Sequence, residues 1–156
     1  MKKLLFSAIV FLASVSFAAS SGTLTISGTV LSINDIVISP TADATNLNIT
    51  GGETNELVAT VAETSNNLTG YKISMSSANE SKLKHSVDSS KSTTYTVSYD
   101  GGPAVSLTSS AQIVKNVSSL SGLTTDTSNV NVNVAAYPLA PAGDYSDEIT
   151  ISIAAN

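Results

Sequence analysis

Residues 129–134 read Asn-Val-Asn-Val-Asn-Val, a strict alternation of polar and apolar side chains. Successive side chains of a β-strand point to opposite faces of a sheet, so this stretch predicts a strand with its valines buried. The same period recurs on both sides of it, at residues 24–30, 57–61, 71–75, 95–99 and 149–153. About eight or nine short strands at this spacing predict an all-β fold in which two antiparallel sheets pack face to face as a β-sandwich.

The first residues have the anatomy of a secretory signal peptide. Lys2 and Lys3 precede an apolar run over residues 4–15, and Ser16 and Ala18 are small residues at the −3 and −1 positions of a cleavage site. The run is too short to span a bilayer as a mature helix. We therefore expect residues 1–18 to be removed on export, and we expect no membrane insertion of the single domain that remains.

The composition argues against several classes of function. Without Lys2 and Lys3 the chain keeps five Lys and no Arg against twelve acids, a net charge of −7, which disfavours nucleic acid as a partner. There is no Cys, so neither a disulfide nor a Cys nucleophile is available. His85 is the single imidazole, and we expect it to be a solvated surface residue.

Acidic residues gather before the last predicted strand, at Asp144, Asp147 and Glu148. Calcium takes carboxylate oxygens, but the spacing matches no calcium loop, so a charged loop is the favoured interpretation. The sequence therefore predicts no enzyme, no metal and no cofactor.

The segment over residues 22–30 resembles the N-terminal extension of chaperone–usher pilins, the subunits of bacterial fimbriae. In that family a signal peptide is followed by an arm of alternating apolar residues with a glycine at one inward position. The positions that match are Leu24, Ile26, Gly28 and Val30. The resemblance implies a signal peptide over 1–18, a donor-strand extension over 19–31 and a pilin domain over 32–156.

The C-terminus is similar to the family's ending, a Gly-x-Tyr-x-Asp motif followed by an alternating strand. Gly143, Tyr145 and Asp147 match the motif, and Gly143 is fourteenth from the C-terminus, where the family usually has glycine. The family's penultimate tyrosine is Ala155 here, and its disulfide is absent. The chain thus resembles a Cys-free branch, such as the alternate-chaperone pilins or spore coat protein U-like domains.

The resemblance implies an immunoglobulin-like sandwich that lacks its last strand. The arm of one subunit would fill the resulting groove of the next, as an added strand. It also implies a periplasmic chaperone, an outer-membrane usher, copies of itself or sister pilins as partners, and a possible host or surface receptor. The protein would pass through the periplasm to the cell surface. The expected groove wall and chaperone contact comprises Gly143, Tyr145, Ile149, Ile151 and Ile153.

Alternation by itself leaves a second interpretation of residues 24–30 open. They would then form an ordinary first strand of a self-complete sandwich. In that case the protein would be a secreted binding module for a glycan or a surface protein.

Overall fold

The structure, a computed structural model, describes residues 20–156. The expected signal peptide lies outside the described residues. Residues 31–156 form one compact body, and residues 20–30 do not belong to it. We call residues 20–30 the arm. Over residues 20–156, no helix is long and apolar enough to cross a bilayer.

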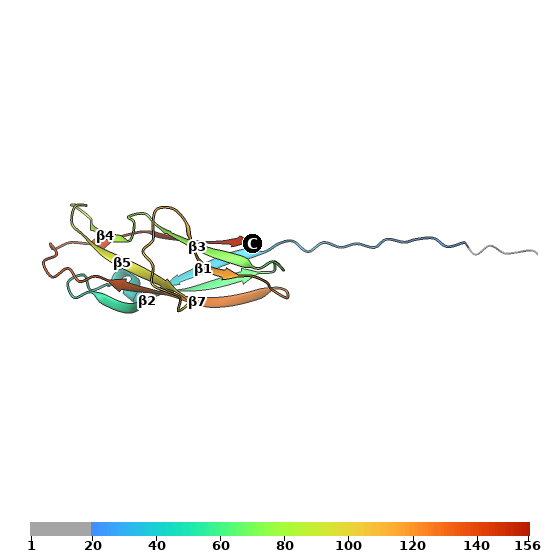
Figure 1. The fold of residues 1–156 in the computed structure, drawn as a ribbon, viewed down its shortest axis with the longest axis horizontal. Helices are drawn as coiled ribbons and strands as arrows, with labels where there is room; N and C mark the ends of the chain where they lie inside the picture. Colours follow the sequence, from blue (N-terminus) through green and yellow to red (C-terminus); the bar gives the residue numbers. More distant parts are fainter. Residues whose placement is uncertain (1–19) are drawn as a thin grey trace, which may run out of the picture. The chain divides into compact units, whose positions relative to one another are not determined.

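The body is all-β, with two sheets and one short 3₁₀ turn, η1 (Ala42–Thr45) (Figure 1). The strands are β1 (Asn34–Pro40), β2 (Glu53–Ser65), β3 (Tyr71–Ser77), β4 (Lys82–His85), β5 (Ser92–Tyr99), β6 (Gln112–Val117), β7 (Thr124–Val134), β8 (Tyr145–Ser146) and β9 (Ile149–Ala155). One sheet has the order β1-β2-β7-β5-β4-β8 and the other β6-β3-β9. All paired strands are antiparallel. This confirms the predicted all-β class and is consistent with a β-sandwich.

Alternation places the core as expected. In β7, Val130, Val132 and Val134 are buried, while the asparagines between them stay on the outer face. Tyr71, Ile73 and Met75 of β3 are buried in the same way and belong to the same core. The two sheets thus share one apolar interior, because each contributes the inward half of its residues.

The strand pairings define two ends of the body. We call base the end formed by residues 31–33, 66–70, 118–123 and 156, where β1 begins and β9 ends. We call apex the opposite end, formed by residues 41–52, 78–91 and 135–147, where β1 ends and β9 begins. Backbone hydrogen bonds tie the loops of each end together, for example Leu120 N–H to Leu68 O at the base and Ser86 N–H to Asp144 O at the apex.

A buried polar network joins the two sheets through the core. Glu63 of β2 is fully buried and accepts hydrogen bonds from the hydroxyls of Tyr71 (2.6 Å) and Tyr99. The ammonium of Lys115 lies 3.1 Å from Glu63 Oε2 and 2.7 Å from Asp126 Oδ2. The network therefore spans strands of both sheets and leaves none of its buried atoms without a partner.

The charges of this network are fixed by their mutual contacts. Burial by itself raises the pKa of Glu63, but hydrogen bonds from Tyr71 and Tyr99 and the neighbouring Lys115 outweigh it, so that pKa lies below its ordinary value. Burial lowers the pKa of Lys115, and its contacts with Asp126 and Glu63 raise it by more, so the net shift is upward. The raised pKa favours the protonated form of Lys115, so its ion pairs with Glu63 and Asp126 link the two sheets.

Candidate interaction site

The candidate site is an apolar groove between β1 and β9. Within the described residues, β1 pairs with β2 alone and β9 with β3 alone, so each strand presents one open backbone edge. The two strands lie next to each other, but no hydrogen-bond ladder joins them in this part of the chain. An open edge is a template for pairing with a further strand.

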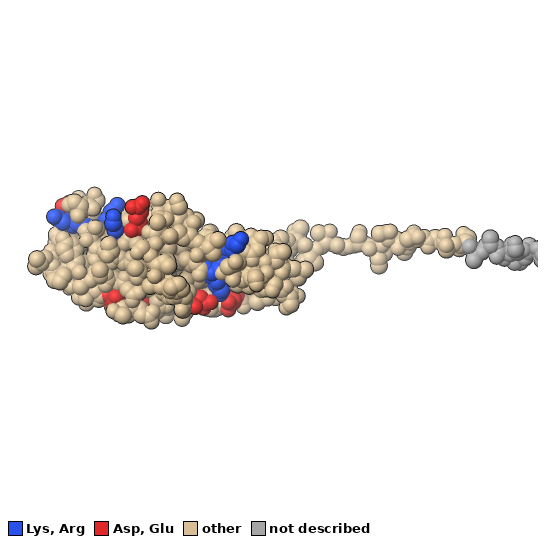
Figure 2. All heavy atoms as spheres, viewed as in Figure 1, with Lys and Arg blue, Asp and Glu red and all other residues tan. Residues whose placement is uncertain are grey.

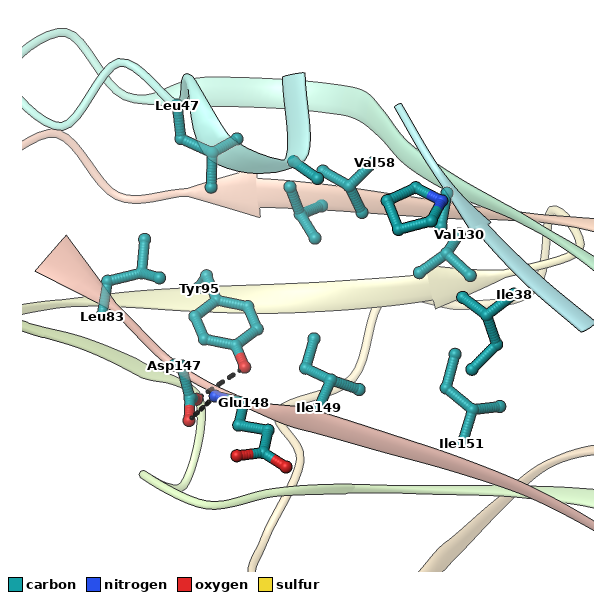
Figure 3. Close-up of a pocket in the computed structure, with 14 residues that line it drawn as sticks. Ile38, Leu47, Val58, Leu83, Tyr95, Val130, Asp147, Glu148, Ile149 and Ile151 are labelled. Atoms are coloured by element: carbon teal, nitrogen blue, oxygen red, sulfur yellow. Dashed lines mark hydrogen bonds between the residues drawn. The ribbon is translucent and has the colours of Figure 1, made fainter. Parts of the chain in front are cut away.

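Residues of both sheets line the groove, which has a volume of about 340 Å³. Ile38 and Pro40 of β1 form one rim, and Ile149 and Ile151 of β9 form the other (Figure 3). The floor and the apex side are formed by Ala44, Leu47, Val58, Ala59, Leu83, Tyr95, Val130 and Val132. Ile38 remains 42% exposed although its register places it on the inward face beside Val61, which is fully buried. An inward-facing isoleucine that remains exposed to solvent indicates that no strand or loop covers the core at this position.

Asp147 closes the groove toward the apex. Its carboxylate accepts a hydrogen bond from the hydroxyl of Tyr95 at 2.7 Å (Figure 3). It also accepts hydrogen bonds from the hydroxyl of Ser77 (2.6 Å) and from the backbone N–H of Asn79 (2.9 Å). Burial raises the pKa of Tyr95, and its bond to Asp147 raises it further. The oxygens of Asp147 are thus used within the protein.

The groove continues into a second hollow of about 420 Å³ at the apex. It shares Ala44, Leu47, Leu83 and Asp147 with the first and adds Gly143 and Tyr145. The structure therefore brings four of the five expected wall residues to the lining of one continuous groove. The fifth, Ile153, lies on the inward face of β9 opposite Ile73, beyond the lined part.

His85 differs from the expectation. It is 9% exposed rather than a solvated surface residue. Its Nδ1 accepts hydrogen bonds from the backbone N–H groups of Val87 and Asp88, both at 3.1 Å, so its Nε2–H donates to Ala142 O at 3.1 Å. The expectation was wrong because His85 occupies an inward position of β4, a strand too short and too lysine-rich to be recognised from its sequence.

Gly143 owes its identity to this histidine. Its φ is +148°, and a Cβ at this position would lie 2.2 Å from His85 Nε2. Tyr145 packs edge-on against the same ring, with 5.1 Å between ring centroids. Gly143 and Tyr145 thus shape the apex end of the groove by packing around His85.

The arm carries the four residues expected to fill such a groove. Residues 20–33 contain no strand, and Leu24, Ile26 and Val30 are 86–87% exposed. An added Cβ at Gly28 would meet nothing within 4 Å. The first strand of the described residues is β1, and residues 24–30 form no strand.

Several lining residues were missed by the sequence analysis. Leu47, Val58 and Leu83 come from a turn, a bulge and a lysine-rich strand, none of which has a clean alternation. Leu47 and Leu83 are isolated apolar residues between polar neighbours, whereas Val58 lies in an apolar run. Few charged side chains appear on the face of the molecule seen in Figure 2. The chain matches no protein-family model and no curated protein sequence.

Proposed function

We propose that the protein is a structural subunit of a bacterial surface pilus that polymerises by donor-strand exchange. Its body would be an incomplete immunoglobulin-like sandwich, and the arm of one copy would become the missing strand between β1 and β9 of the next. The observation that carries the proposal is that one chain has both an apolar groove between two open strand edges and an arm of exposed, alternating apolar residues.

The physical gain from this exchange has two parts. Strand addition satisfies backbone donors and acceptors on both open edges. Burying Leu24, Ile26 and Val30 contributes roughly 1.5–3 kcal/mol each. Both parts are lacking in a free body, because its groove and its arm each expose apolar surface.

The other partners follow from the same open edges. A body with an uncovered groove is an aggregation hazard, so a periplasmic chaperone would cover β9 until the arm of another copy or a sister pilin replaces it. An outer-membrane usher would then pass the growing polymer to the cell surface. The role is structural, in support of adhesion or biofilm, with a host or surface receptor as a further possible partner.

Deleting the arm tests the proposal. The full chain, expressed with its signal for export, should give SDS-resistant ladders in unboiled samples, and deletion of residues 19–31 should abolish them. A further variant carries a second copy of residues 22–31 linked after Asn156. It should be a monomer of raised thermal stability, because the linked strand fills its own groove. A full-length protein that stays monomeric with its arm resistant to protease would sink the proposal and favour the self-complete binding module.

A further inference from the structure

Hydrogen bonds hold the segment that follows the arm, residues 31–33, to the base of the body. The side-chain amide of Asn66 donates to Leu31 O at 2.8 Å, and its Oδ1 accepts the backbone N–H of Ile33 at 2.7 Å. Ser32 donates its hydroxyl to Asn67 Oδ1 at 2.8 Å. Residues 31–33 are therefore held to the base, and the last apolar residue of the arm, Val30, directly precedes this held segment.

The arm matches in length the two strands that flank the groove. The alternating segment over residues 24–30 has seven residues, as do β1 and β9. Seven extended residues span about 20 Å at 3.3 Å per residue. An arm that pairs with these strands along their whole length therefore stops where the strands stop. Because residues 31–33 are already part of the donor's base, the donor body begins at that end of the acceptor.

The requirement that the polymer keep growing determines whether the donor body lies at the base or at the apex of the acceptor. β1 runs from base to apex and β9 from apex to base. An inserted arm that left the groove at the acceptor's base would bring two bases together. The arm of each subunit also leaves its own body at the base. Two subunits joined base to base would therefore fill each other's grooves and form a closed pair. Continued growth requires the arm to run antiparallel to β9 and to leave at the apex.

The base and one loop of the apex, residues 135–143, carry exposed apolar side chains and no charged side chain. The base exposes Leu31 (79%), Leu68 (71%) and Leu123 (64%), and its three segments contain no charged side chain. The apex exposes Val87 and Leu139, each 89%. Leu139 lies in the loop over residues 135–143, which also has no charged side chain and leads into the apex end of the groove. Isolated exposed leucines are ordinary, but three of them lie in the base, from which the arm leaves the body.

We propose that successive subunits also bind through this second contact, in which the base of the donor packs on the 135–143 loop and Val87 of the acceptor's apex. The inference rests on the proposed function, since it concerns the polymer that donor-strand exchange builds. With this contact, the junction between two subunits would have a fixed direction rather than being a flexible link. Asn66 contributes because it holds residues 31–33, which follow the arm, to the base.

Engineered cysteines test the contact in a chain that has no Cys of its own. Leu68→Cys and Leu139→Cys place one thiol on each end, and Asn129→Cys, exposed on β7 between the ends, is the matched control. Polymers of the Leu68→Cys/Leu139→Cys double variant, oxidised and then boiled in SDS without reductant, should keep a ladder that reductant collapses. Each single variant, and each pairing with Asn129→Cys, should lose the ladder and run as monomer.

The outcomes separate this inference from the proposed function. Unboiled ladders in every variant together with a covalent ladder in the double variant alone support the contact. Unboiled ladders with disulfide dimers in either single variant would show base-to-base or apex-to-apex packing and overturn it, as would the absence of any crosslink. Absence of the unboiled ladder from the unaltered protein would overturn donor-strand exchange and the contact with it.

Discussion

Replacing Ile26 by alanine separates assembly from folding. In the free protein this side chain is 87% exposed, so its removal should change the free energy of unfolding of the monomer by less than about 0.5 kcal/mol. In the arrangement inferred above, antiparallel to β9 and with its last residue at the apex, it would lie beside Ile36 of β1 and Ile153 of β9, where truncation of a buried isoleucine costs about 2–3 kcal/mol. That cost corresponds to a dissociation constant about 30- to 150-fold weaker at each junction.

Guanidinium dissociation of preformed polymers, followed by size-exclusion chromatography, measures the loss. Thr25→Ala is the matched control, because Thr25 is equally exposed in the arm but has the opposite parity and would face water in the filled groove. Ile26→Ala polymers should dissociate at clearly lower denaturant concentration than Thr25→Ala polymers, which should resemble the unaltered protein. Equal effects of the two substitutions, or a destabilised Ile26→Ala monomer, would refute insertion with this parity.

Three further substitutions probe the body. Glu63→Gln should lower stability by about 2 kcal/mol at neutral pH, since hydrogen bonds to a charged acceptor weaken. The pKa of Glu63 is depressed below 4.5, so the stabilisation that Glu63 provides is complete above about pH 4.5 and is lost as the pH falls through the folded-state pKa. Urea unfolding across this pH range should show that the free energy of unfolding of the variant falls less steeply toward acid pH than that of the unaltered protein. Gly143→Ala should lose about 1–3 kcal/mol in thermal unfolding because its Cβ meets His85, whereas Gly122→Ala, with open space, should be near neutral; similar values for both would contradict the packing role. Asn66→Ala should cost about 1–2 kcal/mol and speed proteolysis at the held segment, and unchanged cleavage there would contradict its anchoring role.

Alternation predicted most of the core but not its polar brace. β3, β5, β7 and β9 were expected from period two, and their inward residues are buried or half-buried as expected. Glu63 was missed because an acid ends the apparent pattern after Val61, although it keeps the inward parity of Ala59 and Val61. Two tyrosines at inward positions, Tyr71 and Tyr99, were the signal that a buried carboxylate needed partners.

The groove was less predictable than the arm. The alternation of apolar and polar residues over 24–30 is contained in one short segment, so the sequence was enough to identify it. The lining depends on a register shift between Leu57 and Ala59, which brings Val58 into the groove beside Ala59 although simple alternation assigns it to the other face. Such a bulge is set by pairing with β7, and a single strand read alone cannot reveal it.

Buried hydrogen bonds connect the two sheets at two positions. Glu63 bridges the sheets through Tyr71 of β3, and Asp147 links Ser77 of β3 to Tyr95 of β5 at the apex side. Hydrogen bonds have narrow length limits, so each brace fixes the spacing of the sheets at its own position. Closer approach of the two sheets at either position would strain these hydrogen bonds, and breaking one would leave a buried carboxylate with fewer partners, which is costly. In the proposed polymer, the body would therefore receive an inserted strand without a change in the spacing of its sheets.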